Sequence, residues 1–213
     1  MVKFQLQKFM KENIRSRKIR PIILIHGLWN SSEIFRHIIN KLNEYKVEYF
    51  APTLTHKFGM VSISELAYAF NKEVNNKFGQ EEEIDIVGFS MGGIIGRYWI
   101  KKLEGYKRTK RFISIGSPHN GTFTAQIVPK YPFRGISEMK INSDLLNELS
   151  TDNNLLKDID CISFYTMWDL MVFPGWRAYL PLSKKIPIKV FKHKNLVRNP
   201  IAVDKIVKQI INH

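Results

Sequence analysis

Short apolar runs rich in Ile, Val and Phe alternate along the chain with longer segments in which apolar residues recur at helical spacing. Alternation of buried strands with amphipathic helices is typical of a parallel sheet that is covered by helices on both faces. The pattern therefore predicts an α/β fold with about six mostly parallel strands. We expect these strands at residues 22–25, 47–52, 84–89, 111–117, 162–167 and 188–191.

The helices expected between and after these strands span residues 31–45, 62–78, 91–104 and 200–212. Ser62 or Ser64 is suited to cap the second of them, because a serine side chain can accept a hydrogen bond from the first turn. Asn199-Pro200 favours the start of the last helix, since proline is tolerated in a first turn.

The segment 119–160 is longer than a connection between two strands requires, and it contains several prolines and a short amphipathic stretch, "SDLLNELS". Long insertions at the ends of parallel strands often form lids or substrate loops. We therefore expect a lid-like insertion within one domain that covers residues 21–213.

Charge is distributed unevenly along the 213 residues, whose net charge is +14. Residues 1–20 contain seven Lys or Arg and one acid, a net of +6, and residues 181–213 contain eight and one, a net of +7. The first segment is interpreted as a basic N-terminal extension. Basic termini can make weak contacts with an anionic membrane surface or keep a protein soluble, and solubility is the simpler explanation. No stacking aromatics or recognition module accompany them, so nucleic-acid binding is not expected.

Cys161 is the only cysteine, so the chain cannot form an internal disulfide. The N-terminus lacks the apolar centre of a secretory signal, and no apolar run is long enough to span a membrane. We expect a cytoplasmic protein, at most peripheral at the membrane surface. The oligomeric state is not indicated.

The stretch "IDIVGFSMGG" carries the strongest chemical signal in the chain. A strand that ends in Gly-x-Ser-x-Gly and continues as a helix exposes the serine hydroxyl at a tight turn, and Gly88 and Gly92 provide the space. Ser90 is therefore a candidate nucleophile. The same motif also fits a plain strand-to-helix turn, so the two interpretations have to be distinguished by the presence of a base and a carboxylate elsewhere in the chain.

A serine nucleophile needs a base and a carboxylate, expected downstream in the order acid, then histidine. Of the histidines after Ser90, His213 is terminal and His119 comes too early, whereas His193 follows the last expected strand. Asp169 follows the strand before it and lies among apolar residues, where a carboxylate is costly without a partner. The weaker acid candidates lie in the insertion: Asp144, Asp152, Asp158 and Asp160. A surface histidine and a turn-capping aspartate are the ordinary alternatives.

Two backbone amides are expected to stabilise an oxyanion. One belongs to Met91, which follows the serine. The other belongs to Leu28 in "ILIHGLWN", where Gly27 permits a tight bend. His26 is expected to brace this loop through hydrogen bonds, and Trp29 either lines an acyl pocket or packs in the core.

The motifs "HGLWN", "VGFSMGGIIGRYWI", "GSPHNGT" and "WDLMVFP", together with the late His193, resemble those of the α/β-hydrolase fold family, particularly small bacterial lipases and esterases. The resemblance runs from residue 21 almost to the C-terminus. It implies a minimal α/β-hydrolase fold and a Ser90–His193–Asp169 triad, with Leu28 and Met91 as oxyanion donors. Phe89 stands where the family more often has histidine.

These residues together predict a serine hydrolase that cleaves carboxylic esters, of a small-molecule or lipid substrate, through an acyl-enzyme. No cofactor or metal is expected. The alternatives are an acyltransferase that uses the same triad and a non-catalytic binding protein with this fold.

Overall fold

The computed structural model describes residues 19–151 and 153–211. The expectations that concern residues 1–18, Asp152 and His213 lie outside the described residues. These include most of the basic extension.

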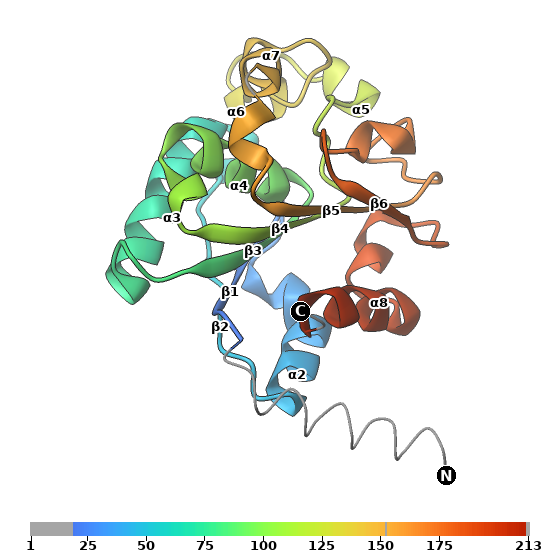
Figure 1. The fold of residues 1–213 in the computed structure, drawn as a ribbon. Coiled ribbons are helices and arrows are strands. Elements are labelled where there is room, and N and C mark those ends of the chain that lie inside the picture. Colours follow the sequence, from blue (N-terminus) through green and yellow to red (C-terminus); the bar gives the residue numbers. More distant parts are fainter. Residues whose placement is uncertain (1–18, 152, 212–213) are drawn as a thin grey trace.

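A single six-stranded sheet forms the centre of the described chain, and every neighbouring pair of strands is parallel (Figure 1). The strand order is β2-β1-β3-β4-β5-β6. The predicted α/β fold with six parallel strands is confirmed. The strands are β1 (Ile22–Ile25), β2 (Tyr49–Phe50), β3 (Ile84–Phe89), β4 (Thr109–Ile115), β5 (Asp160–Tyr165) and β6 (Lys184–Pro187).

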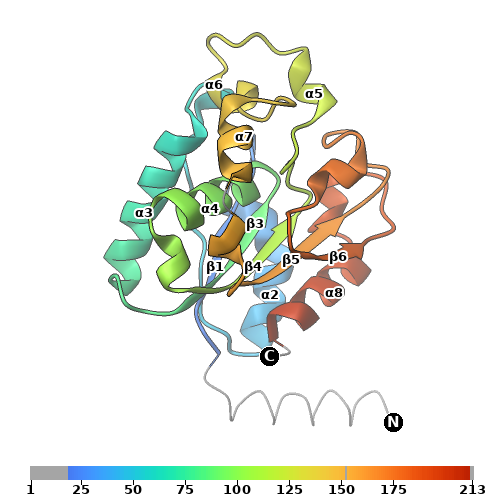
Figure 2. The same ribbon diagram turned by 45° about the horizontal axis from the view of Figure 1, so that its top comes forward.

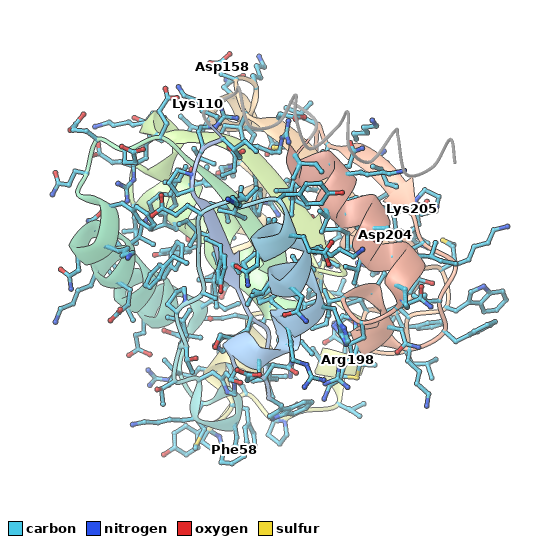
Figure 3. The ribbon with its side chains drawn as sticks, turned by 90° about the horizontal axis from the view of Figure 1, so that it is seen from below. Phe58, Lys110, Asp158, Arg198, Asp204 and Lys205 are labelled. Atoms are coloured by element: carbon cyan, nitrogen blue, oxygen red, sulfur yellow. The ribbon has the colours of Figure 1, made fainter. Side chains whose placement is uncertain are left out.

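Helices cover both faces of the sheet, as Figure 1 shows. α2 (Arg36–Glu44) and α8 (Pro200–Ile211) pack on one face and lie side by side (Figure 3). α3 (Ile63–Phe78) and α4 (Met91–Lys102) pack on the other face. The central strands β1 and β3 are completely buried, because both of their faces are covered. Six short 3-10 helices complete the described chain: η1 (Ser32–Phe35), η2 (Lys57–Gly59), η3 (Gly105–Lys107), η4 (Asn153–Leu156), η5 (Gly175–Ala178) and η6 (His193–Leu196).

The helix starts follow the capping chemistry expected from the sequence. Ser62 caps α3 in a capping box with Glu65, since the Ser62 hydroxyl accepts from the Glu65 amide at 3.2 Å and the Ser62 amide donates to Glu65 at 3.0 Å. α8 begins at Pro200, and the side chain of Asn199 accepts from the amides of Ile201 and Ala202. Ser62, rather than Ser64, is therefore the N-cap residue.

The predicted last strand at 188–191 is wrong. The sixth strand is Lys184–Pro187, an edge strand whose side chains are mostly exposed, so it lacks the apolar pattern of a buried strand. Ile188 and Val190 are buried after this strand and pack in the core beside α8. The apolar signal therefore came from an irregular segment, and His193 follows β6 after a five-residue connection rather than directly.

The insertion after β4 contains α5 (Phe123–Gln126), α6 (Arg134–Ser137) and α7 (Asp144–Ser150), which lie on the same side of the sheet as α4 (Figure 2). α7 is fixed to α4 by Arg97, which is completely buried. The Arg97 guanidinium donates to the Leu149 carbonyl at 2.8 Å, and so supplies positive charge at the C-terminal end of α7. The α7 part of the insertion is therefore held against the domain, and a lid function for the remainder stays a prediction.

Among the described residues, no helix has both the length and the apolar character that crossing a membrane requires.

Candidate active site

Ser90 lies at the turn between β3 and α4 with φ 55° and ψ −127°, a strained backbone conformation for a residue other than glycine. The turn is tight enough to exclude side chains on both sides. A Cβ atom on Gly92 would lie 2.0 Å from the carbonyl oxygen of Ile25, and one on Gly88 would lie 2.5 Å from the Cα of Gly93. The glycines around Ser90 are thus required by close backbone packing, as the motif predicted.

The loop after β1 passes directly against this serine. A Cβ atom on Gly27 would lie 2.7 Å from the Cβ of Ser90. Leu28 is the next residue after Gly27 in the chain. Met91 is the first residue of α4, and amides in a first helical turn have no acceptor within the helix. Both expected oxyanion donors are therefore next to Ser90 in the chain or in space, and their role stays a prediction.

His26 braces this loop, as expected. Its Nε2 accepts a hydrogen bond from the Leu54 amide at 2.9 Å, and its Nδ1 lies 2.9 Å from the Gly27 carbonyl oxygen, to which it donates. Burial lowers the pKa of His26, which favours the neutral ring that this pair of bonds requires. Trp29 is 54% exposed, so it does not pack in the core.

Asp169 and His193 are in direct contact. Nδ1 of His193 donates to Oδ2 of Asp169 at 2.7 Å, and only 1% of Asp169 and 9% of His193 is exposed. Oδ1 of Asp169 accepts from the amides of Met171 at 2.9 Å and Val172 at 3.1 Å. These two amides fix the carboxylate, so that its other oxygen faces the imidazole.

The imidazole of His193 is held on three sides. The ring of Phe89 stacks on it, with 4.8 Å between centroids and an interplanar angle of 29°. Gly116, at φ +55°, lies close to the ring, since a Cβ atom there would stand 3.0 Å from Cε1 of His193. Nε2 of His193 is buried and has no hydrogen-bond partner among the described residues. No hydrogen bond joins Ser90 to this nitrogen within the described residues, so its role as the base stays a prediction.

Hydrogen bonds from the first residues of the insertion hold the loop that carries Asp169. Thr122 Oγ1 donates to the Met171 carbonyl at 3.0 Å and accepts from the Phe173 amide at 2.9 Å. Nδ2 of Asn120 donates to the Tyr179 carbonyl at 2.8 Å. This role of Asn120 and Thr122 was not predicted from the sequence. Their polar side chains in "GSPHNGT" were the available signal, but no local pattern identifies their partners.

His119, the alternative base, is completely buried, and neither ring nitrogen has a hydrogen-bond partner among the described residues. Burial, with the nearby Arg97 charge as a smaller cause, holds the pKa of His119 well below its usual value. His119 therefore forms part of the packing next to Phe112. The described insertion acids Asp144, Asp158 and Asp160 make no hydrogen bond to His193 in the described part of the chain. Asp160 instead pairs with Arg111 at 2.8 Å.

No group of three His, Cys, Asp or Glu side chains that could hold a metal ion occurs within residues 19–151 and 153–211. The expectation of chemistry without a metal or cofactor stays a prediction.

Solved structures with the same architecture include Aspergillus fumigatus lipase B, with a TM-score of 0.75 and 15% identity over 92% of this chain and 53% of that chain. The mature form of Bacillus licheniformis lipase BlEst2 has a TM-score of 0.68 and 14% identity over 91% of this chain and 92% of that chain. At these identities the likeness concerns the fold, and it confirms the α/β-hydrolase fold.

Curated relatives and a family model match the chain by sequence. Lysosomal thioesterase PPT2 is 27% identical in Mus musculus and 26% in Homo sapiens over 108 residues, which cover 49% of this chain and 35% of each relative. The chain thus spans about a third of the length of these relatives. The family model described as palmitoyl protein thioesterase matches residues 21–168. Since this match covers well over half of the chain, the protein belongs to the palmitoyl protein thioesterase family, a family of serine hydrolases with the α/β-hydrolase fold.

Proposed function

We propose that the protein hydrolyses fatty acyl esters or thioesters through an acyl-enzyme on Ser90. The observation that carries this proposal is the 2.7 Å hydrogen bond between His193 and Asp169, formed while the opposite ring nitrogen of His193 has no hydrogen-bond partner in the described part of the chain. This arrangement orients and polarises an imidazole as a base, and Ser90 directly follows Phe89, whose ring stacks on that imidazole.

In the proposed reaction, Oγ of Ser90 attacks the acyl carbonyl carbon while Nε2 of His193 accepts the hydroxyl proton. Collapse of the tetrahedral intermediate breaks the bond to the leaving oxygen or sulfur, which receives that proton from His193. A water molecule then attacks the acyl carbon and gives a proton to Nε2 of His193. Collapse of this second intermediate breaks the bond to Oγ of Ser90, which takes that proton back, and the acid is released. Asp169 keeps Nδ1 protonated and stabilises the imidazolium in both steps.

Negative charge develops on the acyl oxygen during each attack. The amides of Leu28 and Met91 are proposed to donate to it, because Gly27 places one loop against Ser90 and α4 begins at Met91. Removal of one such donor typically costs about a hundredfold or more in turnover.

An exposed apolar surface next to Asp169 and His193 supports an acyl chain as substrate. It is called the apolar rim here. Ring contacts join two pairs of its side chains, with 6.3 Å between the Trp168 and Phe191 centroids and 6.5 Å between those of Phe123 and Phe173. Large exposed apolar patches mark binding sites, since they are costly in water. The rim consists of Phe123, Met167, Trp168, Leu170, Met171, Phe173, Trp176 and Phe191, each at least 43% exposed.

The family and its curated relatives favour a thioester as the substrate, whereas the lipases with this fold favour a carboxylic ester. An acyltransferase would use the same acyl-enzyme and differ only in the acceptor. The relatives are named as lysosomal proteins. The expected cytoplasmic location of this chain stays a prediction.

The proposal is tested with acyl chains of two to sixteen carbons, each offered as a p-nitrophenyl ester and as an N-acetylcysteamine thioester. We expect kcat/KM to rise from acetyl to longer chains, because each methylene buried against the apolar rim contributes about 0.8 kcal/mol. Ser90→Ala is the inactive control, and an added acceptor alcohol reveals any transfer product. A monotonic fall in kcat/KM from the acetyl substrates upward would contradict the acyl-chain assignment.

A further inference from the structure

Six cations are concentrated in the segment that begins with β6 and ends before α8. This segment, residues 184–198, contains no Asp or Glu. All six side chains are exposed, and none of them forms an ion pair in the described part of the chain. The segment is called the basic strip here, and its cations are Lys184, Lys185, Lys189, Lys192, Lys194 and Arg198. These cations are therefore available to an anionic surface.

Phe191 joins the basic strip to the apolar rim. It lies between Lys189 and Lys192 in the chain, and it is 75% exposed. The centroid of its ring lies 6.3 Å from that of Trp168, which is itself 67% exposed. An apolar surface and a positively charged surface are therefore continuous here.

This continuous surface lies at the carboxyl edge of the sheet. β6 is parallel to β5, with Pro187 opposite Tyr165, so the basic strip leaves β6 at that edge. Figure 3 shows Arg198, the last cation of the strip, in the half of the molecule away from Lys110 and Asp158, which lie near the starts of β4 and β5. The rim and the strip thus share the edge at which Ser90 follows β3.

The two proposed partners of Ser90 are carried by the same two surfaces. Asp169 directly follows the rim residue Trp168, and His193 directly follows the strip residue Lys192. Asp169 and His193 are themselves buried, so the exposed side chains are those beside them. A lipid surface that covers the rim and the strip would therefore hold its acyl chains next to the groups that the proposed reaction uses.

The size and the charge of this surface indicate what covers it. One acyl chain is a single carbon chain wide, whereas the rim has eight large exposed side chains from the loops after β4, β5 and β6. A second copy of the protein would place another basic strip against the first across a two-fold interface, where like charges repel. An anionic bilayer offers partners to both parts, because its phosphates attract the cations while Trp and Phe side chains favour the region just below the headgroups.

We propose that the apolar rim and the basic strip together dock the protein on an anionic lipid bilayer. The rim aromatics enter the bilayer at the level of the headgroups, and the cations of the strip lie on the lipid phosphates. The substrates are then acyl esters or thioesters whose acyl chains are held in that bilayer. This last statement rests on the proposed function, whereas the docking itself is independent of it.

Co-sedimentation with lipid vesicles tests the docking. The wild type and Ser90→Ala should bind vesicles of phosphatidylcholine with about 30% phosphatidylglycerol, should bind pure phosphatidylcholine about tenfold more weakly, and should be released by salt. In Lys189→Ala/Lys192→Ala we expect binding to the anionic vesicles to weaken about tenfold or more, since each cation near the surface adds to the attraction. In Trp168→Ser/Phe191→Ser we expect a loss of about tenfold or more, because the inserted rings are removed.

Each double variant has a matched control elsewhere on the surface. Lys205→Ala/Lys208→Ala removes two exposed cations from α8, and Tyr68→Ser/Tyr106→Ser removes two exposed aromatic rings outside the rim. Both controls should bind the anionic vesicles as tightly as the wild type does. Thermal unfolding of all four double variants separates a loss of binding from a loss of the fold.

Fluorescence quenching tests the insertion of the rim. A phosphatidylcholine with brominated acyl chains quenches a tryptophan that enters the bilayer. Mixed into the anionic vesicles, it should quench the wild type, and it should quench Trp168→Phe less. Binding without any quenching would overturn the insertion of the rim.

Binding to neither kind of vesicle, or equal binding by the wild type and both rim and strip variants, would overturn the docking surface. A dimer in solution that Trp168→Ser/Phe191→Ser dissociates would assign the rim to a second copy of the protein and would also overturn the proposal. Retained hydrolysis in Ser90→Ala would refute the proposed function, and the vesicle results would still decide on the docking.

Discussion

Replacement of Asp169 by asparagine separates the role of the carboxylate from its packing. Oδ1 of Asp169 accepts hydrogen bonds from two backbone amides, while Oδ2 accepts from Nδ1 of His193 at 2.7 Å. In Asp169→Asn the amide oxygen should keep the place of Oδ1. The opposite orientation would set the side-chain NH₂ against the Met171 and Val172 amides and leave both unsatisfied, at about 1–3 kcal/mol each.

The side-chain NH₂ of asparagine then faces Nδ1 of His193 and donates to it. Nδ1 becomes an acceptor, the ring proton moves to Nε2, and the imidazole can no longer accept the Ser90 proton. The developing imidazolium also loses its anionic partner. We expect kcat/KM to fall by about 10³ to 10⁴, which corresponds to about 4–5.5 kcal/mol of transition-state stabilisation.

The assay is hydrolysis of a p-nitrophenyl ester at pH 7.5, with thermal unfolding as the control for structure. Because asparagine has nearly the same shape, keeps both bonds from the backbone amides and only reverses the direction of the bond to His193, the melting temperature should change far less than the activity. Activity within tenfold of wild type in a folded Asp169→Asn protein would refute this role for the carboxylate.

Three further outcomes follow from the packing and the buried groups. Gly92→Ala should lower stability and kcat/KM, because its Cβ would meet the Ile25 carbonyl at 2.0 Å and overpacking typically costs about 1–3 kcal/mol. In thermal unfolding Gly96→Ala in the same helix should cost less, because its Cβ would meet only side-chain atoms, at 3.1–3.4 Å. His119 has a lowered pKa in the folded protein, so the unfolded chain binds the extra proton as pH falls below about 6.5, and the free energy of unfolding should decrease by up to about 1.4 kcal/mol per pH unit. Urea unfolding at pH 7.5 and 5.5 should show a smaller decrease in His119→Leu, and an equal decrease would contradict the assignment. Burial raises the pKa of the Cys161 thiol to about 12, so iodoacetamide at pH 8 should modify it only after unfolding, and rapid modification of the folded protein would be inconsistent with this burial.

Much of the fold could be predicted because its central strands are covered on both faces. The apolar runs of β1 and β3 predicted the observed bounds at 22–25 and 84–89. β6 could not be found in this way, since an edge strand carries charged residues and proline. Strand order also stayed beyond the sequence, because periodicity reports which residues are buried but not which strands are neighbours.

In the candidate site, too, features made by residues close together in the chain could be predicted, and contacts between distant residues could not. The turn at Ser90 is built from residues next to each other in the chain, so its glycines were informative. Asp169 and His193 were selected by their order, and the structure brings them together. The stacking of Phe89 on His193 and the bond from Thr122 to Met171 join residues far apart in sequence, the second pair by 49 positions. Such pairs leave no local pattern.

Active-site labelling tests the central claim most directly. A fluorophosphonate reacts only with an activated serine, and digestion followed by mass spectrometry identifies the modified residue. We expect one adduct per chain on Ser90, slower labelling in His193→Ala and none in Ser90→Ala. An adduct on another serine, or labelling that survives in Ser90→Ala, would contradict the assignment of the nucleophile and the mechanism built on it.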